Sequence, residues 1–109
     1  MNGGRVVLRF ADDVPVLTLV GEFDLSNADD IRNAIATVAN GRGGRIVFDL
    51  SETTFLDSTI LGVLARAARD HDVWIRGANG TPRTALEMSG LPGYVHDADA
   101  DTEARSASD

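Results

Sequence analysis

Apolar positions in the first part of the chain gather in two runs that favour strands. Residues 5–10 (RVVLRF) and 14–21 (VPVLTLVG) are rich in β-branched and apolar side chains, and Asp12 and Asp13 between them are typical turn residues. Pro15 would stand near the start of the second strand, where a missing backbone N–H is tolerated. Together these features predict an antiparallel hairpin.

The next segment has the hydrophobic period of a helix. Ile31, Ile35 and Val38 recur at i, i+4 and i+7, which places them on one helical face. Ser26 is suited to cap the start of this helix, and Gly41 is suited to end it. We therefore predict a helix with one apolar face.

Short apolar segments and helical segments alternate along the rest of the chain. In order, we predict strand 45–50, a polar connection 51–57, helix 58–69, strand 72–76, helix 81–90 and a short strand 93–96. Asp57 and Thr81 are suited to cap the two helices, and Gly90 to stop the second one. This order predicts an α/β domain with a mostly parallel sheet, an antiparallel N-terminal edge hairpin and about three helices.

The length of 109 residues suits one domain, which we expect to span residues 5–96. Residues 1–4 are expected to be a flexible N-terminus. Residues 97–109 (DADADTEARSASD) contain five acids and one Arg, which is −4 of the chain's net charge of −7. This composition predicts an acidic disordered tail, which either keeps the protein soluble or interacts with a partner.

Composition excludes several kinds of chemistry. The chain has no cysteine, and all ten basic residues are Arg, so thiolate, disulfide and lysine-dependent chemistry are absent. The two histidines, His71 and His96, lack the spacing of a zinc site, so we expect no metal and no cofactor. The acidic balance argues against nucleic-acid binding, and no apolar run is long enough for membrane insertion. With no signal peptide at its start, the chain is expected to be cytoplasmic.

The helix predicted after Asp57 contains the residues that indicate most about the function. Ser58 would lie in its first turn, where backbone N–H groups are unpaired and the helix dipole favours a phosphate. Ser58, Gly62, Ala65 and Arg69 recur at i, i+4, i+7 and i+11 and form a stripe of small residues up to the Arg. The stripe has two interpretations, namely close packing of the helix on the sheet or a flat docking surface for another protein.

The same segment resembles a known signature. Residues 57–64 (DSTILGVL) are similar to the Asp-Ser-(Ser/Thr)-Gly-Leu-Gly-Val-Leu loop of the STAS domain, the fold of the anti-sigma factor antagonists. Residues 21–24 (GEFD), 49–51 (DLS) and 86–91 (LEMSGL) resemble other parts of that family. The resemblance covers about residues 5–97. One departure is Ile60, which replaces a family Gly and is expected to change the helix start and to add bulk near Ser58.

The resemblance implies a phosphorylation switch in a protein that is not itself an enzyme. By this likeness Ser58 is the phosphoacceptor, Thr59 is the competing acceptor, and Asp24 and Asp57 match positions beside it. The implied partners are an anti-sigma factor with serine kinase activity, which the unphosphorylated antagonist binds so that the sigma factor is freed, and a serine phosphatase that resets the switch. The expected partner-binding residues are Asp24, Asp57, Ser58, Thr59, Gly62, Ala65 and Arg69.

Three other interpretations remain. A response-regulator receiver could pair Asp49 with Asp12 and Asp13, but receivers use a lysine that this chain lacks. A hydrolase could use Asp24, Asp49 and Asp57, but no nucleophile–base pair accompanies them. The third is a STAS interaction module outside sigma control, such as a scaffold in a sensory complex or a subunit of a lipid-transport complex.

Overall fold

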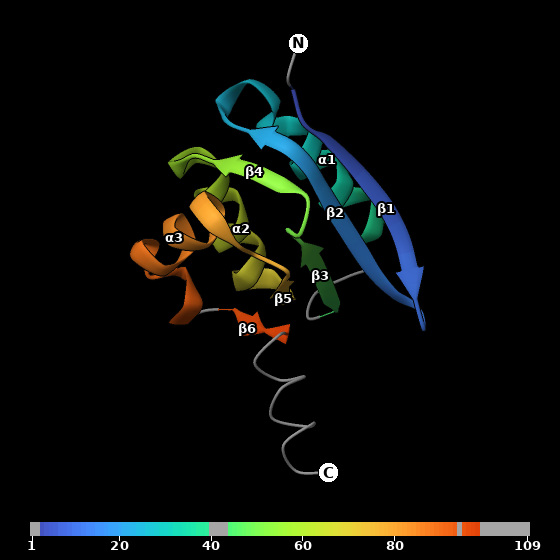
Figure 1. Ribbon diagram of the computed structural model, residues 1–109. Helices are drawn as coiled ribbons and strands as arrows, with labels where there is room; N and C mark the ends of the chain where they lie inside the picture. Colours follow the sequence, from blue (N-terminus) through green and yellow to red (C-terminus); the bar gives the residue numbers. More distant parts are fainter. Residues whose placement is uncertain (1–2, 40–43, 94, 99–109) are drawn as a thin grey trace.

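The longest strand, β2 (Val14–Phe23), pairs with three other strands and organises the sheet (Figure 1). The computed structural model describes residues 3–39, 44–93 and 95–98. The other strands are β1 (Arg5–Ala11), β3 (Arg45–Asp49), β4 (Thr53–Leu56), β5 (Asp72–Arg76) and β6 (His96–Asp97). The sheet order is β1-β2-β3-β5-β6, with β4 paired to β2, and all pairs except β1–β2 are parallel. The predicted α/β fold with its antiparallel hairpin is confirmed.

The hairpin turns through two acidic residues in an unusual backbone conformation. Asp12 and Asp13 have φ values of 52° and 69°, and Ala11 pairs with Val14 on either side of them. A two-residue hairpin loop of type I′ requires positive φ at both positions, and Asp is one of the few residues that tolerates it. The two acids therefore serve the turn, as the sequence predicts.

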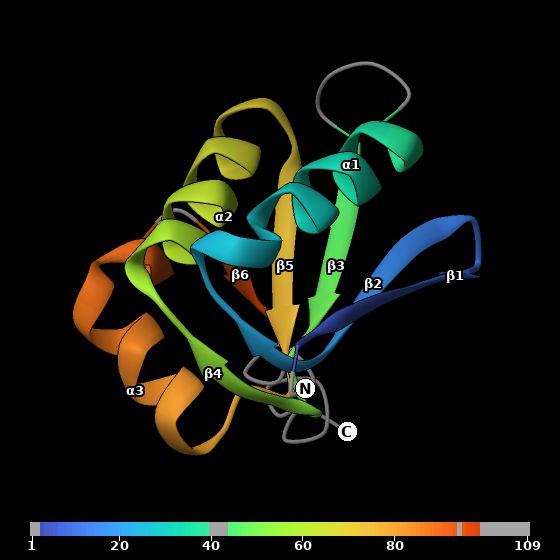
Figure 2. The same ribbon diagram turned by 90° about the horizontal axis from the view of Figure 1, so that it is seen from above.

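Three helices connect the strands, namely α1 (Ala28–Val38), α2 (Ser58–Asp70) and α3 (Gly80–Ser89). Helices α1 and α2 lie side by side over one face of the sheet, and α3 packs beside β4 (Figure 2). The core lies between this sheet face and the helices. Its fully buried side chains include Leu17, Leu19, Phe23, Ile31, Phe48, Ile60 and Leu64.

The sequence prediction misses strand β4, since it treats residues 51–57 as a polar connection only. Within them β4 pairs with the end of β2, where Phe23 lies opposite Leu56. Thr53 is buried, and its hydroxyl donates to the carbonyl of Leu19 at 2.6 Å, so a polar side chain stabilises the strand pairing. A register shift beside Gly21, which has φ 99°, allows β2 to leave β3 and pair with β4.

The predicted helix starts need two corrections. Ser26 does not cap α1; it lies in a short 3₁₀ turn (Leu25–Asn27) and donates its hydroxyl to Asp24, which caps that turn instead. Thr81 lies inside α3, which begins at Gly80. The stop at Gly90 is confirmed, since this residue has φ 80° in the left-handed region that glycine favours.

The ends of the domain differ slightly from the sequence prediction. The last strand consists of His96 and Asp97 instead of 93–96. Before β1, Gly3 forms a bridge with Glu22, and a Cβ on Gly4 would lie 2.5 Å from the Phe23 ring. Gly41 and residues 99–109 lie outside the described residues, so the helix stop at Gly41 and the acidic tail stay predictions.

Asp49, at the end of β3, is held by a network on the sheet face opposite α1 and α2. Its carboxylate accepts from Nε and Nη2 of Arg76, both at 3.2 Å, and from the backbone N–H of Ser51 at 3.0 Å; Arg9 lies 3.7 Å away. Burial alone would raise the pKa of Asp49, but the hydrogen bonds from Ser51 and the charge of Arg76 outweigh burial and lower it.

We predict that Asp49→Asn lowers the free energy of unfolding at pH 7 by about 2 kcal/mol, because charge-assisted hydrogen bonds are lost. The lowered pKa means that Asp49 contributes stability above its unfolded pKa of about 3.9, and that this contribution disappears as the pH falls through the folded pKa. The difference between wild type and variant in urea unfolding should therefore shrink from pH 5 towards about pH 2.

Asp29→Asn, which removes an exposed ion pair with Arg32, is the control and should have little effect at either pH. An Asp49→Asn difference that does not change with pH would contradict the assignment.

Candidate functional site

The start of α2 is fixed by the carboxylate of Asp57. One oxygen, Oδ1, accepts from the backbone N–H of Ile60 at 3.1 Å and caps the helix, as predicted. The other oxygen, Oδ2, accepts from the backbone N–H of Leu25 at 3.2 Å. The backbone N–H of Asp57 donates to the carbonyl of Phe23, also at 3.2 Å. A single residue therefore ties the start of α2 to the segment that follows β2.

Asp24 lies at the same edge of the sheet as Asp57. Phe23 of β2 pairs with Leu56 of β4, and each of the two acids directly follows one of these paired residues. The Asp24 carboxylate accepts from the hydroxyl of Ser26 at 2.5 Å and from its backbone N–H at 2.9 Å. The hydroxyl contributes most, and these bonds together lower the pKa of Asp24 below its usual value. Asp24 is therefore ionised at neutral pH and is turned towards Ser26.

Ser58 is the first residue of α2 and is exposed, whereas Thr59 is half-buried. Ile60 is 0% exposed and belongs to the core. The expectation that Ile60 alters the helix start and crowds the acceptor is therefore wrong, since α2 begins at Ser58 with an ordinary cap and the Ile60 side chain points inward. The Ile60 side chain, which departs from the family signature, is therefore accommodated in the hydrophobic core.

A groove of about 830 Å³ runs between α2 and α3, with Ser58 on its lining. The α2 side contributes Ser58, Leu61, Gly62 and Ala65, and the α3 side contributes Ala85, Met88 and Ser89; Leu56, Gly90 and Leu91 complete the lining. Met88 is 83% exposed, which is unusual for a large apolar side chain. The structure thus brings three residues of the predicted stripe together on one concave apolar surface.

Gly62 bears on the first interpretation of the stripe, which is close packing of the helix on the sheet. A Cβ built at Gly62 meets no atom within 4 Å, so close packing within the domain does not require glycine there. Ala65 is half-buried; it packs against the core and also lines the groove. Arg69 is exposed near the end of α2, outside the groove lining.

The α3 side of the groove is absent from the sequence prediction. The sequence pattern that indicates it is the spacing of apolar residues in α3. Ala85 and Met88 are spaced i, i+3 and share one side of the helix, whereas the buried Leu86 points to another side. A Met on the solvent side of a helix, next to a family-like Gly-Leu exit, would have indicated this surface.

The competing carboxylate clusters do not form. Asp12 and Asp13 lie at the hairpin turn, whereas Asp49 lies at the opposite end of β3, so no receiver-like acidic pocket exists. Thr18 of β2 pairs with Asp49, and Asp24 follows six residues later, which separates the two acids by about 20 Å along the strand. Among residues 3–39, 44–93 and 95–98, no group of three or more His, Cys, Asp or Glu side chains could hold a metal ion.

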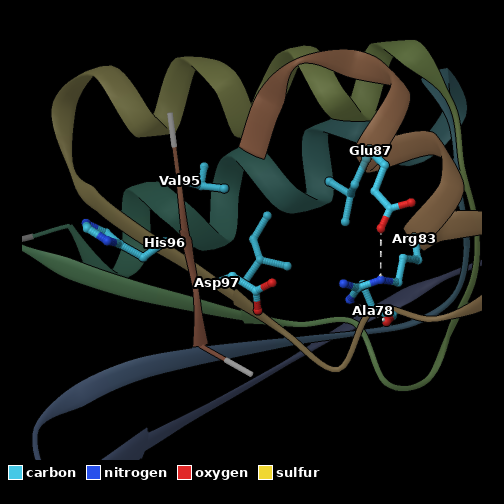
Figure 3. A pocket seen from close by; sticks show the side chains of 8 residues that line it. Ala78, Arg83, Glu87, Val95, His96 and Asp97 are labelled. Atoms are coloured by element: carbon cyan, nitrogen blue, oxygen red, sulfur yellow. Dashed lines mark hydrogen bonds and ion pairs between the residues drawn. The ribbon is translucent and has the colours of Figure 1, made fainter. Parts of the chain in front are cut away.

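A second, smaller cavity lies between α3 and the β5–β6 edge (Figure 3). Its volume is about 70 Å³, which is the space of a few water molecules. Ile75, Ala78, Leu86 and Val95 form its apolar lining, and an ion pair of 3.1 Å joins Arg83 and Glu87 at its rim. Ser58 does not line this cavity, so we assign the site to the α2–α3 groove.

The fold is a single α/β domain in which the exposed Ser58 lies on the lining of the α2–α3 groove. A family model described as "Mlab, STAS domain" matches residues 6–96, and the chain belongs to the STAS domain family. No curated protein sequence matches the chain significantly. In the part of the chain that the structure describes, no helix is both long and apolar enough to cross a bilayer.

Two solved structures show the same fold. An anti-sigma factor antagonist from Mycobacterium paratuberculosis is 26% identical, with a TM-score of 0.76 over 94% of this chain and 95% of that chain. The anti-sigma factor antagonist SpoIIAA in its unphosphorylated form is 22% identical, with a TM-score of 0.68 over 93% of this chain and 96% of that chain. The likeness to SpoIIAA concerns the fold alone.

We predict that Gly62→Ala raises the free energy of unfolding by about 1 kcal/mol, because alanine is the better helix former and the added methyl group meets no neighbour. Gly77→Ala is the matched control. Gly77 has φ 75°, and its Cβ would lie 2.9 Å from Ser51, so this variant should be destabilised. Urea unfolding of both variants measures the difference. A loss of stability in Gly62→Ala would show that α2 packs more closely at this point than the structure has it.

Proposed function

We propose that this protein is a cytoplasmic anti-sigma factor antagonist. In its unphosphorylated form it binds an anti-sigma factor that has serine kinase activity, with the α2–α3 groove as the docking surface, and so frees the sigma factor. Phosphorylation of Ser58 ends this binding, and a serine phosphatase restores it. The observation that carries the proposal is that Ser58 lies exposed on a groove whose Gly62 has no packing role in the domain.

The geometry of Asp57 suits a charge-based switch. Its two carboxylate oxygens are held by Ile60 and Leu25, so the carboxylate cannot turn away from a phosphate on the neighbouring residue. A phosphate adds a charge of about −1.5 to −2 next to the Asp57 carboxylate, and repulsion directs it away from the cap towards the groove. The new charge therefore appears on the surface that the partner would cover.

The expected size of the effect is large enough for a switch. The groove is lined mainly by apolar and small side chains, which offer a dianion few groups to replace its water. A loss of about 3 kcal/mol of binding free energy weakens an interaction by more than a hundredfold. Because Ile60 and the rest of the buried side of α2 lie elsewhere, the change does not require refolding.

Ser58 suits the acceptor role better than Thr59. A kinase must reach the hydroxyl with its ATP site, and Ser58 is exposed whereas Thr59 is half-buried. The chain supplies only the hydroxyl in this reaction, and the groups that activate it belong to the partner. This division agrees with a protein that is not an enzyme. The anti-sigma factor antagonist name of the 26% identical structure supports the same role.

We predict that Ser58→Ala keeps the affinity for the cognate kinase-type anti-sigma factor and that Ser58→Glu lowers it about a hundredfold. Asn33→Glu, which adds the same charge on the exposed side of α1, is the control and should bind like wild type. Calorimetry with the purified partner measures all three. Gly62→Arg, which fills the groove, should abolish binding whatever residue stands at position 58.

Labelling with the same partner and radioactive ATP identifies the acceptor. Thr59→Ala should be labelled and Ser58→Ala should not. Label on Ser58→Ala, or equal affinities for the Ala and Glu variants, would contradict the switch at Ser58.

A STAS interaction module outside sigma control is the second candidate. The observation that favours it is the matching family model, whose description states a STAS domain and no antagonist role. Such a module would use the same groove with a different partner. Capture from a host lysate with the Ser58→Ala and Ser58→Glu proteins separates the two functions. A kinase-type anti-sigma factor retained by the first alone supports the antagonist, and scaffold or transporter proteins retained by both support the second candidate.

A further inference from the structure

On the sheet face opposite α1 and α2, a row of paired side chains crosses all five strands of the main path, with Val16 buried within it. Arg9 pairs with Val16, Val16 with Val47, Val47 with Trp74, and Trp74 with His96. Residues paired in this way point to the same side of a sheet. None of the helices α1, α2 and α3 lies over this row in the described part of the chain (Figure 2). We call this surface the open face.

The open face is basic, although the protein as a whole is acidic. By strand alternation Arg5, Arg9, Arg45 and Arg76 point to this side, against three acids, namely Glu22, Asp49 and Asp72. This face therefore has one more Arg than acidic residues in a chain of net charge −7. Such a reversal of sign attracts an anionic segment.

An aromatic stack lies towards the β6 edge of this surface. The guanidinium of Arg45 lies 4.3 Å from the centre of the Trp74 ring, and the Trp74 ring stacks on His96 at 4.4 Å. Asp72 holds both flanking groups, accepting from Arg45 Nε at 3.2 Å and lying 3.1 Å from His96 Nε2. The stack is thus held in place before any ligand arrives, and it ends at β6.

We propose that the acidic segment 99–109 of this chain docks on the open face. The segment contains four acids and one Arg and follows directly after Ala98 at the end of β6, where the open face has its edge. Four strand spacings of about 4.8 Å separate β6 from β1, so the face is about 19 Å wide. Eleven residues extend to more than about 33 Å, so the segment reaches across all the strands.

Tethering is what makes this occupant more favourable than a free acidic peptide. Exposed carboxylate–guanidinium pairs are individually weak, and a short separate peptide would bind poorly. A segment attached at the edge of its own site acts at an effective concentration of about millimolar or higher, which compensates for weak pairs. The contact is expected to depend strongly on salt, because its charges stay near solvent.

Trp74 is the only tryptophan in the chain and lies on β5, beside the edge strand β6 after which the segment begins, so its fluorescence reports the docking directly. We compare the full chain with a chain that ends at Ala98 and with the full-length variant Asp99→Asn/Asp101→Asn/Glu103→Gln. Removal and neutralisation should both shift the emission to longer wavelength and increase quenching by acrylamide. Arg105→Ala, which makes the segment more acidic, is the matched control and should leave Trp74 at least as protected as in wild type.

Salt and added peptide complete the test. The difference between the full and the shortened chain should fade between about 0.01 M and 1 M salt, since the screening length falls from about 30 Å to about 3 Å. A synthetic peptide of residues 97–109 should restore the emission of the shortened chain at about millimolar concentration. Equal emission and quenching for the full, shortened and neutralised chains would overturn the proposal. Protection that rises with protein concentration, together with a dimer in light scattering, would assign the face to a second copy and would also overturn it.

Discussion

The carboxylate of Asp57 is the contact on which the candidate site depends. It accepts one hydrogen bond from the start of α2 and one from the segment after β2, and so joins two parts of the chain that are 32 residues apart. The β2–β4 pairing, which ends at Phe23, connects the same two parts of the chain. The position and the electrostatic surroundings of Ser58 follow from this arrangement.

The buried residues of helix α2 lie on the side that faces the sheet, and its exposed residues lie on the side that faces the groove. Ile60, Val63, Leu64 and Ala67 are buried and anchor the helix on the sheet, whereas Ser58 and Gly62 lie exposed on the groove. A residue that changes charge on the exposed side acts on a partner without disturbing the packing beneath. The same division explains why Ile60 can replace a family glycine, since the replacement lies on the anchored side.

Much of the fold could be predicted from hydrophobic period and turn residues, and the site only in part. The hairpin, the three helices and the Asp57 cap depend on local patterns, which a sequence displays directly. Strand β4 escaped prediction because it is four residues long and its stability comes from a distant contact, the Thr53 hydroxyl on the Leu19 carbonyl. The caps at Ser26 and Thr81 were wrong because neighbouring residues started those turns. The α3 wall of the groove with Met88 depends on how two helices pack, which no local pattern specifies.

The central claim is that phosphate at Ser58 changes the surface of the groove and leaves the domain unchanged. Amide NMR spectra of the protein with phosphoserine installed at position 58, compared with the unmodified protein, test this claim most directly. The account predicts shifts confined to the start of α2, the 24–26 turn and the groove, with the signals of β3 and β5 unmoved. Widespread shifts through β3 and β5, or loss of signal dispersion, would contradict it, because phosphorylation would then act by altering the fold.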